Sequence, residues 1–302
     1  MKLLIVLLFV FLVGVSGCLN ISIFKDKAPA EEAAFVGGTQ GLTAEFVELP
    51  QKIFQDTSMD IKLRVQNKGE AAIPEGSAQF TLNNAGAFQV DPAVQTNEVD
   101  FDKVRKFGSA VQGSIPTEIV WSSPGPRGLI LTEEQSIPIS VDLCYPYSTF
   151  TLTKACAARS STSTICQPDA FLDVQNSGAP IQVTSLRNVA VPREGAIELA
   201  LIMEIENLGE GDVYYDASLD SCNELSSTFL DKAFVKSISF GNLRVTEPEC
   251  TPGTTLSFIN DIAKTTCRIT VDTTADIEND LVVELGYYYR ERVSAAVSVI
   301  PL

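Results

Sequence analysis

The chain has 302 residues, of which 45% are hydrophobic and 20% are charged, a composition typical of folded globular protein with room for two domains. Asp and Glu number 38 against 22 Lys and Arg, and the net charge of −16 repels nucleic-acid phosphates and anionic lipid head groups. The chain contains no histidine, which excludes a Ser-His-Asp triad, a Cys-His dyad and any zinc site with histidine ligands. No Gly-rich phosphate loop or nucleophile elbow occurs. We therefore expect a protein that is not an enzyme and that uses no cofactor, no metal and no nucleic-acid partner.

The N-terminus has the order of segments that is typical of an export signal. Lys2 precedes an apolar run from Leu3 to Val13, which small residues and then Cys18 follow. The run is shorter than the roughly 20 apolar residues that a membrane-spanning helix needs. We expect a signal peptide over residues 1–17, with an uncleaved signal anchor as the alternative.

Val15-Ser16-Gly17-Cys18 resembles the lipobox of prokaryotic lipoproteins, in which the cysteine is acylated and begins the mature chain. The resemblance implies a lipid anchor at Cys18, which places the protein at the outer face of the cell membrane, in an extracytoplasmic space. The chain has seven cysteines, so removing Cys18 leaves an even number for disulfides. The alternative is a signal-peptidase site in which Cys18 only happens to follow two small residues. Residues 18–40 are small, polar and mixed in charge, and they predict a flexible tether.

The strongest internal signal is a repeat with a period near 140 residues. Residues 58–70 match residues 198–210, and in both copies apolar residues alternate with polar ones, as in a strand with one solvated face. Each copy then reaches an Asn-x-Gly sequence, which is typical of a tight turn with positive φ. Residues 139–147 likewise match residues 281–289. These paired matches indicate a duplicated domain.

The β-branched and aromatic residues of these runs predict an all-β protein with two tandem Ig-like β-sandwich domains after the N-terminal signal and lipid-anchor segment. Domain 1 covers residues 41–158, a Ser- and Thr-rich linker covers 159–178, and domain 2 covers 179–302. Two segments, 100–107 and 223–237, carry a 3.6-residue apolar stripe and predict a helical turn or two. The candidate strands lie near residues 42–49, 59–65, 78–82, 118–121, 137–143, 149–157, 181–191, 196–206, 213–216, 233–240, 267–271, 281–288 and 293–300.

The sequences MDIKLRVQNKGEAAIP, LIMEIENLGEGDVY and VDLCYPYSTFTLTKACA resemble Ig-like repeats of the CARDB type, which are common in archaeal exported and cell-surface proteins. The likeness covers most of residues 41–302 and rests on strand-and-turn patterns. It implies a structural, adhesive or ligand-presenting module, with envelope proteins or glycans as partners, and it brings no catalytic residues. A binding subunit of an envelope transport or secretion complex is the alternative function.

The six cysteines after Cys18 are expected to form disulfides, because an exported protein occupies an oxidising space. Cys144 and Cys156 correspond to Gly286 and Ser298, so the second copy lacks both cysteines of one expected hairpin. This joint loss favours a Cys144–Cys156 bridge, while a Cys156–Cys166 bridge stays open. The other expected pairs are Cys250–Cys267, as a loop closure, and Cys166–Cys222, by elimination.

Tyrosines near the matched ends of the copies are candidates for a surface that stacks on a sugar or a partner. The alternative is that they cover the edge of the core and hydrogen-bond to the backbone. Trp121 is either a core residue or an exposed anchor, and the acidic segment 272–280 is either a calcium loop or, as its spacing favours, a solvated turn. The candidate tyrosines are Tyr145, Tyr147, Tyr287, Tyr288 and Tyr289.

Overall fold

The computed structural model describes residues 33–126, 131–215, 222 and 225–302. Residues 34–302 form one compact unit. The predicted signal peptide, the predicted anchor Cys18 and residues 19–32 of the tether lie outside the described residues.

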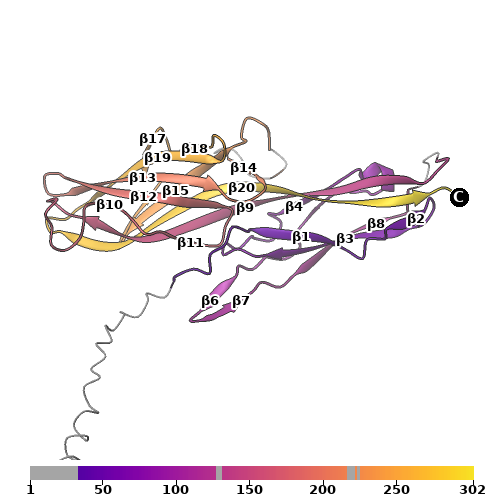
Figure 1. Ribbon diagram of the computed structural model, residues 1–302, viewed down its shortest axis with the longest axis horizontal. Helices are drawn as coiled ribbons and strands as arrows, with labels where there is room; N and C mark the ends of the chain where they lie inside the picture. Colours follow the sequence, from indigo (N-terminus) through magenta and orange to yellow (C-terminus); the bar gives the residue numbers. More distant parts are fainter. Residues whose placement is uncertain (1–32, 127–130, 216–221, 223–224) are drawn as a thin grey trace, which may run out of the picture. The chain divides into compact units, whose positions relative to one another are not determined.

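The described residues are mostly β-strand, which confirms the predicted all-β class (Figure 1). Helical conformation among them is limited to a short 3-10 helix, η1 (Ala85–Phe88), and to Cys222. The helical turns expected over 100–107 and over the described part of 223–237 are wrong, because β6 (Arg105–Phe107) and β15 (Lys232–Phe240) are strands. Residues 223 and 224 lie outside the described residues. In β15 the buried residues mostly alternate with less buried ones, which is the two-residue period of a strand and not the 3.6-residue period of a helix.

Within the described residues, the strands form two small sheets, one large sheet and an isolated hairpin (Figure 1). The first small sheet has the order β1 (Leu42–Val47), β3 (Met59–Asn67), β8 (Thr117–Ser123). The second has the order β10 (Asp169–Phe171), β12 (Ile181–Pro192), β13 (Ile197–Asn207), β19 (Ile262–Val271), β17 (Glu249–Thr251). The hairpin pairs β6 with β7 (Ala110–Gln112).

The large sheet has the order β16 (Leu243–Thr246), β15, β20 (Ile277–Ile300), β9 (Gln135–Ala157), β4 (Gln79–Asn83), β5 (Val94–Thr96). Four short strands add to it, and they are β2 (Lys52–Phe54), β11 (Gln175–Asn176), β14 (Asp212–Tyr214) and β18 (Thr255–Ser257).

Two long strands form the middle of the large sheet. β9 has 23 residues and β20 has 24, and they pair antiparallel from Ala157–Ile277 to Gln135–Val299 without a shift in register. The sequence predicted two strands in each of these segments, 137–143 and 149–157 in the first and 281–288 and 293–300 in the second. That division is wrong, because Pro146 lies opposite Tyr288 within continuous pairing.

Each half of the chain contains one of these long strands, β9 in the first half and β20 in the second. The two halves exchange the C-terminal ends of these strands. β4 pairs with residues 140–144 of β9, and β15 pairs with residues 281–286 of β20. Because β9 and β20 are antiparallel, the C-terminal part of each runs beside the N-terminal part of the other. Matched positions of the repeat, Pro146 and Tyr288, face each other, so an approximate twofold axis passes between them.

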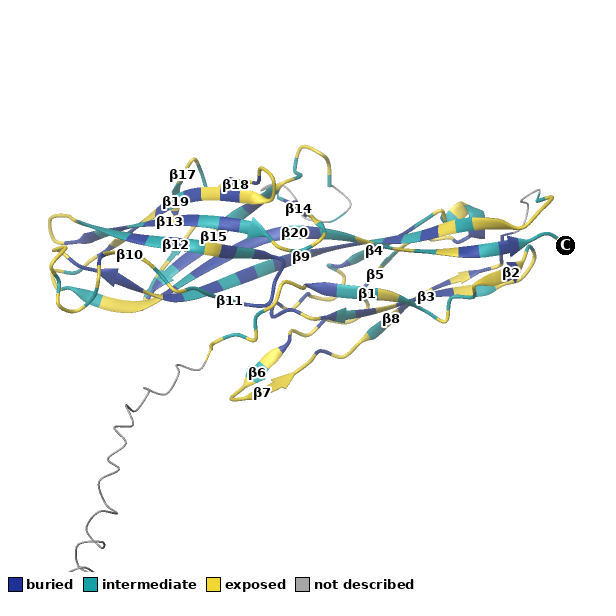
Figure 2. Cartoon of the chain, viewed as in Figure 1, coloured by how far each residue is buried: buried dark blue, intermediate teal, exposed yellow. Residues whose placement is uncertain are grey.

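The inner faces of both small sheets and of the large sheet contribute to one buried cluster (Figure 2). In β3, Ile61, Leu63 and Val65 are buried, while the side chains between them face solvent. Trp121 on β8 is buried, which confirms its assignment to the core. The division into 41–158, 159–178 and 179–302 stays a prediction, and β10 and β11 lie within the segment that the sequence assigned to the linker.

Three disulfides join Cys144 to Cys222, Cys156 to Cys166, and Cys250 to Cys267. The Cys250–Cys267 prediction is confirmed, and so is the alternative bridge Cys156–Cys166. The Cys144–Cys156 and Cys166–Cys222 pairs are wrong. Both Cys144 and Cys156 lie on β9, and twelve residues of extended strand separate them by about 40 Å, beyond the reach of a disulfide.

Candidate functional site

Four of the five candidate tyrosines form a buried row at the centre of the large sheet. Tyr147 lies opposite Tyr287 and Tyr145 lies opposite Tyr289 in the β9–β20 register. Their rings contact each other with centroids 5.6 to 6.3 Å apart. The predicted stacking surface is therefore wrong for these four, because rings inside the core do not reach a ligand. Tyr288 is half-buried, opposite Pro146.

The tyrosine hydroxyls hydrogen-bond to the backbone, as the alternative interpretation predicted. The Tyr147 hydroxyl donates to Asn67 Oδ1 at 3.1 Å and accepts the N–H of Ala71 at 3.4 Å. The same Asn67 Oδ1 accepts the N–H of Gly69 at 3.0 Å, and Asn67 Nδ2 donates to the Ala71 carbonyl at 2.7 Å. Asn67, Gly69, Ala71 and Tyr147 are called the first Asn–Tyr motif below.

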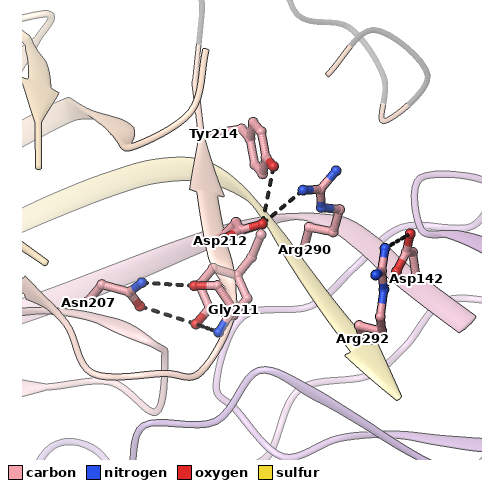
Figure 3. A network of polar contacts seen from close by, with 8 residues as sticks. Asp142, Asn207, Gly211, Asp212, Tyr214, Arg290 and Arg292 are labelled. Carbon is pink, nitrogen blue, oxygen red and sulfur yellow. Dashed lines mark hydrogen bonds and ion pairs between the residues drawn. The ribbon is translucent and has the colours of Figure 1, made fainter. Parts of the chain in front are cut away.

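The second copy contains the same motif, of which Figure 3 labels Asn207 and Gly211. The Tyr289 hydroxyl donates to Asn207 Oδ1 at 3.1 Å and accepts the N–H of Gly211 at 2.8 Å. Asn207 also accepts the N–H of Gly209 at 3.3 Å and donates to the Gly211 carbonyl at 2.9 Å. Asn207, Gly209, Gly211 and Tyr289 form the second Asn–Tyr motif. Burial raises the pKa of both tyrosines, so their hydroxyls remain donors across the physiological range.

The glycines of the Asn-x-Gly sequences are required by close contact and not by positive φ. Neither Gly69 nor Gly209 has a positive φ. A Cβ atom on Gly69 would collide with the Tyr147 hydroxyl, and one on Gly209 would collide with the Tyr289 hydroxyl. The sequence identified the repeated glycine correctly but gave the wrong physical reason for it.

A charged pocket of about 250 Å³ lies beside the second motif (Figure 3). Arg290 bonds Asp212 at 2.8 Å and lies over the Tyr214 ring, and Arg292 bonds Asp142 at 2.9 Å. The lining residues are Asp142, Glu210, Gly211, Asp212, Arg290, Glu291 and Arg292.

Glu291 is the titratable group of this pocket with the largest shift. Burial raises its pKa to about 7, while the hydrogen bond from the Tyr145 hydroxyl at 3.3 Å works in the opposite direction. Both arginines are already bonded to carboxylates, so the pocket offers a proton-binding carboxyl but no free cation for an anionic substrate. No group of acidic and cysteine side chains within the described residues is arranged to hold a metal ion.

A second pocket, of about 480 Å³, lies at the base of the β6–β7 hairpin. Three phenylalanines and two valines supply its apolar part, and three cationic side chains lie among them. The lining residues are Ala34, Phe35, Glu70, Lys103, Val104, Arg105, Lys106, Phe107, Phe150 and Val282.

Glu70 fixes the chain that enters this pocket. Its buried carboxylate accepts the backbone N–H groups of Val36 at 3.0 Å, Gly37 at 2.9 Å and Gly178 at 2.7 Å. Sequence reasoning did not identify this pocket. The available signal was the stretch 103–117, which contains three basic residues and no acidic residue in a strongly acidic chain.

The chain matches no protein-family model and no curated protein. Among the residues that the structure describes, no helix is both long and apolar enough to cross a membrane.

Proposed function

We propose that this chain is a membrane-anchored extracytoplasmic protein with a structural, adhesive or ligand-presenting role and no catalysis. The proposal is carried by the cysteines. All six described cysteines pair with one another, which is typical of an oxidising, extracytoplasmic space and leaves Cys18 as the one remaining thiol of the chain. Cys18 stands at the lipobox-like sequence, after an export-signal pattern.

The body that the anchor would carry is proposed to be a pair of Ig-like, CARDB-type sandwiches. The two Asn–Tyr motifs support this, because both copies of the repeat build the same set of hydrogen bonds. The absence of histidine and the ion-paired arginines of the charged pocket support a role without catalysis. Partners would be envelope proteins or glycans.

Metabolic labelling with a radioactive lipid precursor tests the anchor. Wild-type protein should incorporate the label and Cys18→Ser should not. The double variant Cys250→Ser, Cys267→Ser is the matched control, because it removes two disulfide-bonded cysteines of the body but not Cys18 and should keep the label. Equal labelling of wild type and Cys18→Ser would refute the lipid anchor.

A binding subunit of an envelope complex is the second candidate. The observation that favours it is the pair of large apolar side chains exposed on the second half, Phe171 at 74% and Ile259 at 75%. Cross-linking in intact membranes should then give one stoichiometric partner, and Phe171→Asp should release it. A chain that stays uncross-linked leaves the structural role as the better description.

A further inference from the structure

The β6–β7 hairpin is separate from every other sheet of the described chain. Its strands pair only with each other, and most of its residues are exposed. The exposed fractions are 58% for Phe107, 55% for Val111 and 83% for Ile115. A two-stranded ribbon gains little stability alone, and clustered exposed apolar side chains commonly mark a surface that meets another phase or molecule.

The charge of the hairpin is opposite to that of the whole chain. Lys103, Arg105 and Lys106 are the only charged residues in 103–117, whereas the chain carries −16. The ion pair of Arg105 with Asp102, at 3.5 Å between two exposed groups, is too weak and too screened to cancel the charge of Arg105. Repulsion between the whole chain and an anionic surface is screened over about 8–10 Å in physiological salt. The charges within this distance of the surface therefore determine whether the hairpin is attracted to it.

The hairpin lies beside the N-terminal segment that leads into β1. Ala34 and Phe35 line the same pocket as Arg105 and Phe107, and Glu70 fixes the residues that follow. The hairpin and the segment that leads into β1 accordingly lie on the same side of the body in Figure 1.

Residues 19–33 separate Cys18 from this point, and a chain of that length spans at most roughly 50 Å. An anchored Cys18 therefore keeps the hairpin near the bilayer, where a weak contact becomes intramolecular and effective.

We propose that the β6–β7 hairpin is a second membrane contact, which inserts Phe107 and its neighbouring apolar side chains among anionic lipids while Lys103 and Arg105 bind the head groups. This proposal rests on the proposed membrane anchoring. A bilayer fits better than a protein groove because both faces of the ribbon carry apolar side chains. Lys106 and Val111 are cross-strand neighbours, and Phe107 lies on the other face beside Ala110.

Tryptophan substitutions in the full chain test the contact. Phe107→Trp reports the hairpin, and Phe171→Trp on β10 is the matched control, because Phe171 is also exposed and lies on the second half. Wild type, which has only the buried Trp121, supplies the baseline. In vesicles that contain anionic brominated lipid, we expect fluorescence quenching of about twofold for Phe107→Trp and none for Phe171→Trp.

Charge reversal tests the head-group part. The double variant Lys103→Glu, Arg105→Glu should lose the quenching seen with Phe107→Trp, whereas Lys264→Glu on β19 should retain it. Equal quenching in purely neutral vesicles would overturn the role of anionic lipid.

Flotation of the same samples separates the two proposals. If the full chain does not float with vesicles, the anchor fails and the hairpin contact fails with it. If the chain floats and Phe107→Trp is quenched no more than Phe171→Trp, the hairpin contact alone is wrong. Shielding of Phe107→Trp in native membranes but not in vesicles would assign the hairpin to a protein partner and would overturn the lipid proposal.

Discussion

At the scale of single residues, the two Asn–Tyr motifs explain why the Asn-x-Gly sequence recurs. The side-chain oxygen of each asparagine accepts a backbone N–H two residues later and also the hydroxyl of a tyrosine about 80 residues away. The asparagine and the glycine lie two residues apart, so the sequence shows both of them. The tyrosine partner is not, because only the packing of β3 on β9, and of β13 on β20, brings it near.

The glycine contacts predict that removing the tyrosine hydroxyl restores stability to a Gly→Ala variant in the second copy but not in the first. Gly209→Ala should destabilise the fold by about 1–3 kcal/mol through overpacking. Adding Tyr289→Phe should recover part of that loss, since the nearest colliding atom is the hydroxyl oxygen and the next is a side-chain atom of Pro180. Urea denaturation of the single and double variants measures this coupling.

Gly69→Ala is the matched comparison. Its Cβ would also meet the carbonyl oxygens of Gly178 and Gln40 at 2.5 and 2.6 Å, so Tyr147→Phe should not rescue it. Equal rescue in the two copies would contradict the contact explanation.

Glu291 predicts a dependence of stability on pH. Its folded pKa of about 7 lies above the ordinary value of 4.5, so between these values the folded chain binds more protons than the unfolded chain. The free energy of unfolding should therefore fall as pH rises from 4.5 to 7, by at most about 3 kcal/mol. Above pH 7 it should change little further from this group. Glu291→Gln should remove this slope and be more stable than wild type at pH 8, whereas the exposed Glu194→Gln should keep the slope. Denaturation midpoints of the wild type and both variants across this pH range measure the slopes.

At the scale of elements, strand positions were largely predictable and strand continuity was not. Alternating burial in β3, β13 and β15 follows the period-two pattern of the sequence. The sequence predicted separate strands over 137–143 and 149–157 and a hairpin that joins Cys144 to Cys156, whereas both cysteines lie on the single strand β9. The pairing of β9 with β20 over their whole length overrides that local signal, and such long-range pairing is not encoded in any short window of sequence.

The disulfides predict an order of stability losses. Cys144–Cys222 joins residues 78 apart, and Cys156–Cys166 joins residues 10 apart. In the chain-entropy model these loops correspond to about 4.5 and about 2.7 kcal/mol of stabilisation. Cys144→Ser with Cys222→Ser should therefore lower the free energy of unfolding more than Cys156→Ser with Cys166→Ser. Non-reducing peptide mapping of the wild type checks the pairing first, and a reversed order of losses would argue against the loop-closure explanation.

At the scale of the whole molecule, the repeat was readable from sequence, but the way its copies join was not. Each copy contributes the last part of its long strand to the sheet of the other copy, as β2 beside residues 298–300 shows for the first half. The tandem arrangement suggested by the matched ends assumed that each copy closes its own core. An approximate twofold axis through Pro146 and Tyr288 instead makes the two cores depend on each other.

This exchange predicts that the intact chain unfolds as one cooperative unit. Residues 41–158 alone lack the β20 segment that pairs with the first part of β9, and their own residues 148–157 lose their partner on β20. Both strand edges would expose unpaired backbone and apolar side chains, so the fragment should be unfolded or should dimerise by pairing β9 with a second β9. Calorimetry of the intact chain should give a single transition, and light scattering of the fragment should show no folded monomer. Two separate transitions, together with a stable monomeric fragment, would mean that each half closes its own core and that the exchanged strand ends contribute little to stability.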